Sequence, residues 1–207
     1  PPRVFRVYSN CRKPRGPADM ELVLASGNAG KLREIAALLQ GFAITVRPQS
    51  DFLVTSVEET ASTFVENAII KARHAARVSG WAALADDSGI TVDAMGGAPG
   101  VFSARYAGSG ASDEENLRKL LDTTAHLPDS ARGCRFVCVM VVMRNADDPQ
   151  PLIATGIWPG QLLRAPRGVG GFGYDPIFQV NSHGCSSAEL PAAVKNALSH
   201  RGQALRT

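Results

Sequence analysis

Apolar and polar positions follow one another along the chain in a way that predicts strands and helices in turn. Residues 22–25 are apolar without interruption, as in a buried strand, and the next apolar residues have the spacing of a helix with one buried face: Leu32, Ile35, Ala36 and Leu39. Gly41 is expected to end that helix, and a second strand is expected at 42–46, stopped by Pro48. Strand, helix and strand in succession are typical of an α/β fold.

Two further helices are indicated by their first turns. Thr63 and Glu66 have the spacing of a capping box, and so do Ser112 and Glu115. Each box is followed by apolar residues at helical spacing: Phe64, Ala68, Ala72 and Ala75 after Thr63, and Leu117, Leu120 and Leu121 after Ser112. Another face of the helix after Thr63 carries Asn67, Lys71 and His74, which are candidates for a functional role only if that face borders a site.

A β-hairpin is expected within this alternating chain. The longest apolar run, 136–143, is predicted to pair with 152–158 across a turn-rich connection. A short strand follows at 177–180, and the last helix is expected to begin near Pro191 and to end with Gly202 as its cap. A hairpin in an alternating chain predicts a mixed sheet with a second lobe.

The turn between the first strand and the first helix is the first candidate for chemistry; it consists of Ser26, Gly27, Asn28, Ala29, Gly30 and Lys31. A strand that turns into a helix at two glycines directs backbone N–H groups and the positive end of the helix dipole at one place, where an anion is the natural occupant. The spacing is not that of a P-loop, in which four residues separate the glycines and Ser or Thr follows the lysine. On these residues alone, phosphate binding and an ordinary structural turn are equally good interpretations.

Two adjacent carboxylates, Asp86 and Asp87, lie between the apolar stretches 81–85 and 90–92. At a strand tip, adjacent residues point to opposite faces, so one carboxylate is expected to face a cleft while backbone donors hold the other. A carboxylate at such an edge is a good Mg²⁺ ligand, because this ion prefers one or two carboxylates together with waters and phosphates. Taken in isolation, the stretch favours the alternative of a simple Asp-Asp-Ser-Gly turn.

The segment 168–176 combines four glycines with two aromatic residues and an acid. Glycine allows close approach of the backbone to a ligand, an exposed Phe172 or Tyr174 offers a face on which a base can stack, and Asp175 can accept hydrogen bonds from base edges. A surface loop anchored by aromatic packing is the alternative interpretation.

Composition and charge narrow the class of protein. The 207 residues, 44% of them hydrophobic, suffice for the core of an α/β domain, and no apolar run approaches the roughly 20 residues of a membrane-spanning helix. The net charge of +3 arises in residues 1–19, which carry five basic groups and one acidic group, whereas residues 20–207 carry 17 basic and 18 acidic groups. The predicted folded part therefore lacks the positive field of a nucleic-acid-binding domain.

We expect residues 1–19 to be a disordered basic extension and residues 20–207 to form the folded domain. The four cysteines, Cys11, Cys134, Cys138 and Cys185, show no metal-binding or disulfide spacing, and no signal peptide is recognisable. A reducing cytoplasm fits these features best.

Several motifs occur together in one order: 26–31, Glu59, the helix with Lys71, ADDSG at 85–89, GAPG at 97–100, SARY at 103–106, GFGYDP at 171–176 and SHRG at 199–202. In this combination the chain resembles the inosine triphosphate pyrophosphatase family, also called Ham1-like, and particularly its bacterial members. The resemblance covers residue 20 to about 205. It implies an α/β fold with an elongated mixed sheet flanked by helices, two lobes with a central cleft, and a homodimer.

The resemblance also implies a reaction and a set of roles. The reaction would be Mg²⁺-dependent hydrolysis of ITP, dITP or XTP to the monophosphate and pyrophosphate, which clears deaminated purines from the nucleotide pool. Lys31, Lys71 and Asp87 would be catalytic, Glu59 and Asp87 would hold the metal, and Asp87 would also activate water. The turn 26–31 would cradle the triphosphate. The nucleoside would be bound by Ser88, Phe172, Gly173, Tyr174, Asp175, Lys195, His200 and Arg201, with Phe172 stacking on the purine.

Selection of a 6-keto purine over adenine requires a donor directed at the keto oxygen, because a 6-amino group there would leave buried donors unpaired. Arg201 and backbone N–H groups are the candidates. Two alternative functions remain: a Maf-type pyrophosphatase of modified pyrimidine nucleotides, and a nucleic-acid-binding module that uses the basic residues 1–19. The charge of residues 20–207 opposes the second, which would also show binding that falls steeply with salt.

Overall fold

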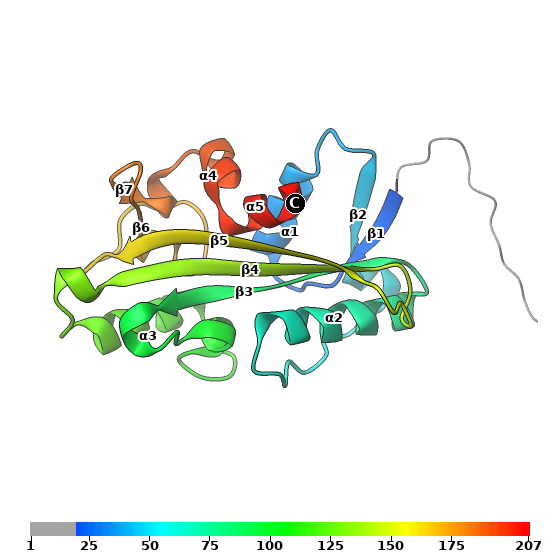
Figure 1. Cartoon of the computed structure of the whole chain (residues 1–207), viewed down its shortest axis with the longest axis horizontal. Helices are drawn as coiled ribbons and strands as arrows, with labels where there is room; N and C mark the ends of the chain where they lie inside the picture. Colours follow the sequence, from blue (N-terminus) through cyan, green and yellow to red (C-terminus); the bar gives the residue numbers. More distant parts are fainter. Residues whose placement is uncertain (1–19) are drawn as a thin grey trace, which may run out of the picture.

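Among residues 20–207, which the computed structural model describes, seven strands form one mixed sheet in the order β2-β1-β3-β4-β5-β6-β7 (Figure 1). β1 is parallel to β2 and β3, and all later neighbours pair in antiparallel fashion. The strands are β1 (Met20–Leu24), β2 (Ile44–Pro48), β3 (Ala83–Val92), β4 (Gly133–Met143), β5 (Leu152–Leu162), β6 (Phe178–Val180) and β7 (Cys185–Ser186). The predicted extension and Cys11 lie outside the described residues.

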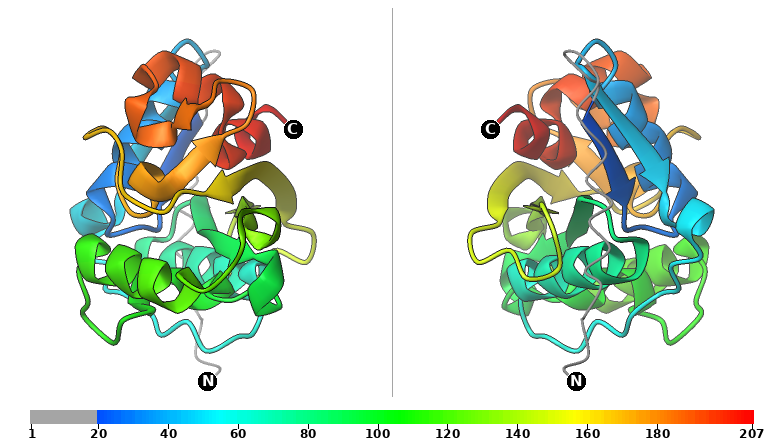
Figure 2. Two further views of the ribbon diagram at one scale, coloured as in Figure 1. Left: turned by 90° about the vertical axis from the view of Figure 1, so that its left-hand side faces the viewer. Right: turned by 90° about the vertical axis from the view of Figure 1, so that its right-hand side faces the viewer.

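Helices cover both faces of this sheet (Figures 1 and 2). α2 (Phe64–Ser79) and α3 (Asp113–Thr124) lie on one face, while α1 (Ala29–Leu38), α4 (Ala192–Leu198) and α5 (His200–Arg206) lie on the other. Short 3-10 helices connect them at Gln49–Phe52, Asp93–Met95, Gly100–Arg105, Asp129–Ala131, Asp175–Ile177 and Ser187–Glu189. The predicted fold class, an elongated mixed sheet flanked by helices, is confirmed. The division into two lobes stays a prediction.

The central strand β4 shows how the sheet separates two cores. Val139 and Val141 are buried with the alanines of α2, whereas Cys138 and Met140 are buried on the opposite face with Ile35 of α1 and Ala204 of α5. Alternate residues of one strand thus serve different helices. None of the helices in residues 20–207 has the length and apolarity that a membrane span requires.

Most local predictions are confirmed. The side chains of Thr63 and Ser112 cap α2 and α3 as expected. The expected hairpin forms from β4 and β5, which are longer than predicted. The second strand starts two residues later than expected and includes Pro48, which an edge strand tolerates. Ala36 is exposed rather than inward-facing.

The prediction of a strand tip at Asp86 and Asp87 is wrong. β3 runs without a break through both residues, because its antiparallel ladder with β4 extends from Ala83 paired with Met143 to Val92 paired with Cys134. The Asp-Asp-Ser-Gly sequence therefore forms strand rather than a turn. The parallel pairing with β1 does end just before it, at Leu84, so the carboxylates lie beyond the carboxyl end of β1.

The predicted end of the last helix is also wrong. The helix breaks at Ser199, which caps α5 by accepting the Gly202 N–H at 3.1 Å. Gly202 lies inside α5, where a Cβ atom would come within 1.9 Å of the Asn196 carbonyl oxygen. This glycine therefore permits the close contact between α4 and α5, and His200 and Arg201 lie in the first turn of α5 rather than at the C-terminal end of a helix.

Candidate active site

The carboxyl end of β1 leads into the predicted anion-binding turn. Asn28 caps α1 by accepting the Lys31 N–H at 3.0 Å, and the Ser26 hydroxyl accepts the Asn28 N–H at 3.2 Å. The strand-to-helix turn is therefore confirmed, and two side chains already shape its backbone. The Lys31 ammonium group lies 3.0 Å from the Asp86 carboxylate.

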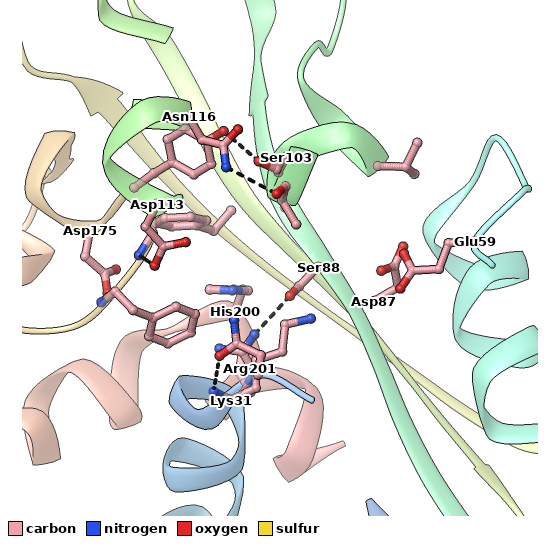
Figure 3. Close-up of a pocket in the computed structure, with 18 of the residues that line it drawn as sticks. Lys31, Glu59, Asp87, Ser88, Ser103, Asp113, Asn116, Asp175, His200 and Arg201 are labelled. Atoms are coloured by element: carbon pink, nitrogen blue, oxygen red, sulfur yellow. Dashed lines mark hydrogen bonds between the residues drawn. The ribbon is translucent and has the colours of Figure 1, made fainter. Parts of the chain in front are cut away.

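Residues of this turn line two adjoining cavities, of which Figure 3 shows the smaller. The larger, the polar cavity of about 210 Å³, is lined mostly by residues with polar side chains, and its lining includes Ser26, Gly27, Gln49, Thr55, Ser56, Val57, Lys71 and His74. The smaller, of about 120 Å³, is lined by Asp87, Ser88, Phe172, Gly173, Tyr174, Asp175, Lys195, His200 and Arg201, together with residues of α3 and the 3-10 helix Gly100–Arg105. Asn28, Lys31, Glu59 and Ala104 line both. Of the predicted site residues, only Ala29 and Gly30 line neither cavity.

Asp86 and Asp87 have separate tasks because they point to opposite faces of β3. Asp86 is 1% exposed and accepts hydrogen bonds from Arg201 Nη2 at 3.1 Å and from the Ser88 hydroxyl at 3.0 Å, besides its ion pair with Lys31. Burial alone would raise the pKa of Asp86, but Lys31 and Arg201 hold that pKa well below its ordinary value. The expectation that backbone donors hold one carboxylate is wrong: side-chain cations hold Asp86.

Asp87 belongs to the α2 face, where Lys71 Nζ approaches its carboxylate at 2.8 Å. Burial raises the pKa of Asp87 above its ordinary value, against the opposing effect of Lys71. Lys71 also lies 3.0 Å from Glu59, and Figure 3 shows the two carboxylates facing each other. Burial disfavours the charge on Lys71, but Asp87, Asp86 and Glu59 together raise the pKa of Lys71, which keeps the ammonium protonated. Two carboxylates thus converge on one cation.

A second charge network lies under the smaller cavity. The Arg201 guanidinium contacts Asp86, donates to Ser88 at 2.9 Å, and pairs with Glu34 of α1. Lys195 of α4 lies 2.7 Å from Glu34 and 2.5 Å from Asp175. Glu34 therefore joins two basic residues that are more than 160 positions away in the chain. The sequence shows Glu34 only as a charged residue on a helix, and no local sequence pattern predicts its ion pairs with Arg201 and Lys195.

Phe172 lies directly over the first turn of α1. A Cβ atom at Gly30 would come within 2.6 Å of the Phe172 ring, so the glycine of the turn is what allows the ring to approach. Lys195 Nζ and the Arg201 guanidinium carbon lie 5.1 Å and 5.7 Å from the ring centroid. The ring therefore lies against the predicted anion-binding turn and within cation–π distance of two cations.

Tyr174 and Asp175 support the Phe172 segment from within. Tyr174 is 6% exposed and its hydroxyl donates to the Ser103 carbonyl at 2.8 Å, so the expectation of an exposed stacking face at Tyr174 is wrong. The Asp175 carboxylate accepts the Phe172 N–H at 2.8 Å and the Ser187 hydroxyl at 2.7 Å, besides its contact with Lys195. Both residues are engaged within the protein and give the cavity wall its shape.

His200 is buried and stacks on Phe136, with ring centroids 4.8 Å apart at an angle of 13°. Burial, together with Arg201 and Lys195, lowers the pKa of His200 well below its ordinary value, so the imidazole is neutral. His200 Nδ1 and Arg201 Nε are buried and find no hydrogen-bond partner among the residues that the structure describes.

We predict that His200 makes the protein sensitive to mild acid. The unfolded chain takes up a proton on this side chain near pH 6.5 and the folded chain does not, so the free energy of unfolding falls as the pH drops through that value, by up to about 1.4 kcal/mol per pH unit. His200→Phe keeps an aromatic ring beside Phe136 and cannot titrate. Urea denaturation at pH 7.5, 6.5 and 5.5 should show a smaller loss of stability for H200F than for the wild type. The exposed His126, changed to Gln, should leave the wild-type slope, and an equal slope in H200F would contradict the prediction.

Several lining or supporting residues were not predicted as site residues: Glu34, Asn67, Ser103, Asp113 and Asn116. Asp113, the first residue of α3, accepts the Gly173 N–H at 2.8 Å. Ser103 and Asn116 form hydrogen bonds with backbone groups that shape the smaller cavity. The capping box was visible in the sequence, but its proximity to segment 168–176 depends on tertiary contacts.

The chain is similar to known proteins over most of its length. The family model described as Ham1 family matches residues 22–207. A dITP/XTP pyrophosphatase of Shigella flexneri is 58% identical over 186 residues, which cover 90% of this chain and 94% of the relative. The protein of that name from Escherichia coli strain K12 is 56% identical with the same coverage. The structure of a HAM1 protein from Coxiella burnetii is 55% identical, with a TM-score of 0.83, over 90% of this chain and 95% of that one.

Proposed function

Since this chain belongs to the Ham1 family, we propose that it hydrolyses the deaminated purine nucleoside triphosphates ITP, dITP and XTP to the nucleoside monophosphate and pyrophosphate. The observation that carries the proposal is the Lys71 ammonium group held between Glu59 and Asp87, where a polar cavity with two lysines meets a cavity with an aromatic wall. The relatives named dITP/XTP pyrophosphatase support the same substrate class.

The two cavities suggest how the substrate lies. The triphosphate occupies the polar cavity, where Lys31, Lys71 and the turn 26–31 offset its negative charge. The nucleoside occupies the smaller cavity, with the purine against Phe172. This orientation puts the innermost phosphate beside Glu59, which lines both cavities, and beside Asp87.

Asp87 is the residue we propose as the base. Its carboxylate lines the cavity and has a raised pKa, so it is a stronger proton acceptor than an exposed aspartate, while Lys71 favours its ionised form. It accepts one hydrogen of a water molecule, orients that water toward the innermost phosphorus, and takes its proton as the new P–O bond forms. The bond to the next phosphate breaks, and Lys31 and Lys71 stabilise the departing pyrophosphate.

Mg²⁺ is the metal that we propose at Glu59 and Asp87. A position between two carboxylates that already attract an ammonium group suits a cation, and Mg²⁺ uses one or two carboxylates together with waters and substrate phosphates. In the described part of the chain no group of three or more His, Cys, Asp or Glu side chains is arranged to hold a metal, so phosphate oxygens and waters would complete the ligand set. When bound, the ion neutralises charge that develops on the phosphates.

We propose that the base is selected by two buried nitrogen atoms, Arg201 Nε and His200 Nδ1, which have no hydrogen-bond partner in the described part of the chain. Two of the Arg201 nitrogens are occupied by Glu34, Asp86 and Ser88, which leaves Nε–H as the donor for a 6-keto oxygen. The neutral His200 has Nδ1 free to form a second hydrogen bond with the purine, as donor or acceptor according to its tautomer. An adenine amino group would place donor against donor, which costs more than the loss of a nonpolar contact.

A nucleotide panel tests this proposal. ITP, dITP and XTP should release pyrophosphate in the presence of Mg²⁺, ATP should be hydrolysed much more slowly, and chelation of the metal should abolish the reaction. In ¹⁸O-labelled water the label should enter the monophosphate. Label in pyrophosphate would overturn the proposed site of attack, and a preference for modified pyrimidine nucleotides would favour the Maf-type alternative.

The homodimer is part of this proposal, since it too comes from the resemblance, and analytical ultracentrifugation would test it. Residence in the cytoplasm likewise stays a prediction. The alternative of nucleic-acid binding through residues 1–19 would require salt-sensitive binding that disappears when those residues are deleted.

A further inference from the structure

Three polar side chains on one face of α2 hold the segment 55–61 against the helix. His74 Nε2 donates to the Thr55 carbonyl at 3.0 Å, and Lys71 pairs with the Glu59 side chain. Asn67 makes two bonds to one residue: its Oδ1 accepts the Ala61 N–H at 3.0 Å and its Nδ2 donates to the Ala61 carbonyl at 3.3 Å. The segment has no regular secondary structure, so these contacts help to determine its position.

Asn67 differs from the other two because it also reaches Asp87. Its side chain is fully buried, and Nδ2 lies 3.4 Å from Asp87 Oδ2. One planar amide therefore connects the backbone of the segment that carries Glu59 with the carboxylate of Asp87 on β3. Both amide hydrogens and the amide oxygen are used within the protein, so this side chain has no donor left for a ligand.

The contacts of Lys71 cannot replace this connection during the reaction. In the proposed function, Lys71 turns part of its charge toward the triphosphate when substrate binds, and its long flexible stem does not fix a distance between Glu59 and Asp87. The amide of Asn67 is rigid and its two bonds to Ala61 orient it. It remains in place when the ammonium group shifts.

We propose that Asn67 is a positioning residue that sets the separation and orientation of Glu59 and Asp87. The inference rests on the proposed function, in which these two carboxylates hold the metal. Residues that orient metal ligands typically contribute about 10- to 100-fold to metal affinity or activity, and Asn67 contacts Asp87 directly and acts on Glu59 through the backbone of Ala61.

Two variants test the inference. Asn67→Ala removes all three bonds, and Asn67→Leu removes them with a side chain of similar size and without added charge. In both, metal binding without nucleotide, measured by calorimetry with Mg²⁺ and by electron paramagnetic resonance with Mn²⁺, should weaken by about tenfold or more. With ITP and saturating Mg²⁺, kcat should fall by a similar factor while KM changes little. The Ala61 amide should lose protection from hydrogen exchange.

Asn116 offers a matched control on α3. It is also a buried amide that holds a loop, accepting the Ala107 N–H at 2.7 Å and donating to the Ala104 carbonyl at 3.2 Å, but among residues 20–207 its side chain forms no hydrogen bond with a carboxylate. Asn116→Ala should lower the melting temperature about as much as N67A and leave the metal dissociation constant unchanged.

The possible outcomes distinguish a failure of the positioning role of Asn67 from a failure of the proposed pyrophosphatase function. If the wild type binds metal and hydrolyses ITP, but N67A or N67L binds metal as tightly and turns over as fast, the positioning role is overturned. An equal loss of metal affinity in N116A would also overturn it, because the effect would then be a general consequence of loosened packing. A wild type without pyrophosphatase activity would refute the proposed function itself. If N67A does not fold, N67L, whose side chain fills the same space, supplies the same readouts.

Discussion

Asp87→Asn is expected to reduce turnover of ITP by about a hundredfold or more while nucleotide binding stays close to that of the wild type. The asparagine has the shape of the aspartate and can still contact Asn67 and a water molecule, but it cannot accept the proton of that water. Because the buried Asp87 has a raised pKa, its replacement removes a stronger base than an exposed carboxylate would provide. Single-turnover kinetics at saturating Mg²⁺ and calorimetry with a non-hydrolysable analogue would measure the two quantities separately.

Asp93 supplies the control for this substitution. It follows β3 directly, is exposed, and pairs with Arg135 at the surface away from both cavities. Asp93→Asn should therefore leave turnover unchanged, since an exposed ion pair contributes little. Near-normal turnover in D87N would mean that another group activates the water, and Glu59 would then be the first alternative to examine.

The parts of the fold that could be predicted are those with local causes. The N-caps at Thr63 and Ser112 and the turn from β1 into α1 depend on residues within four positions of one another, and each formed as expected, although the complete capping box is present only at Ser112. The β4–β5 hairpin also follows from two apolar runs that are close in the sequence. Hydrogen-bonding side chains and short-range apolar spacing suffice for such elements.

Predictions failed where distant residues decide the local structure. Asp86 to Gly89 has the composition of a turn, but pairing with β4, about fifty positions later, keeps it in a strand. Gly202 has the composition of a helix cap, but the close approach of Asn196 requires it inside α5. The ion pair between Glu34 and Arg201 joins residues 167 positions apart, and no spacing rule predicts it.

In the candidate site, too, the features with local causes could be predicted and those that depend on distant residues could not. The anion-binding turn and the two aspartates could be singled out from residue chemistry, whereas grouping them with Lys71, Phe172 and the first turn of α5 required the resemblance to a family. The structure brings these elements together around two cavities, and it adds residues such as Asn67 that have no distinctive sequence signal. From the sequence, Asn67 cannot be distinguished from an exposed helix asparagine, because its hydrogen bonds with Ala61 and Asp87 are seen only in the structure.

Gly156→Ala is expected to destabilise the protein by about 3 kcal/mol, because an added Cβ at this position of β5 has no space. It would lie 1.8 Å from the His200 carbonyl oxygen and 2.8 Å from the Ala204 nitrogen. Both are backbone atoms of α5, which cannot rotate away as a side chain can, so the helix must move off the sheet. A change of this size corresponds to a fall in melting temperature of about 10 °C for a protein of this length.

The displacement of α5 should also weaken nucleoside binding, since His200 and Arg201 belong to the first turn of that helix. In the fraction that remains folded, KM for ITP should rise more than kcat falls, because Asp87, Lys71 and Glu59 lie on the other face of the sheet. Gly27→Ala is the control for stability: its Cβ would meet only the Gln49 side chain at 4.0 Å, an ordinary contact, so the melting temperature should change little. If G156A melts at the wild-type temperature, the close packing of α5 on β5 does not hold α5 in place, and the placement of His200 and Arg201 must then depend on the ion pairs with Glu34 and Asp86 instead.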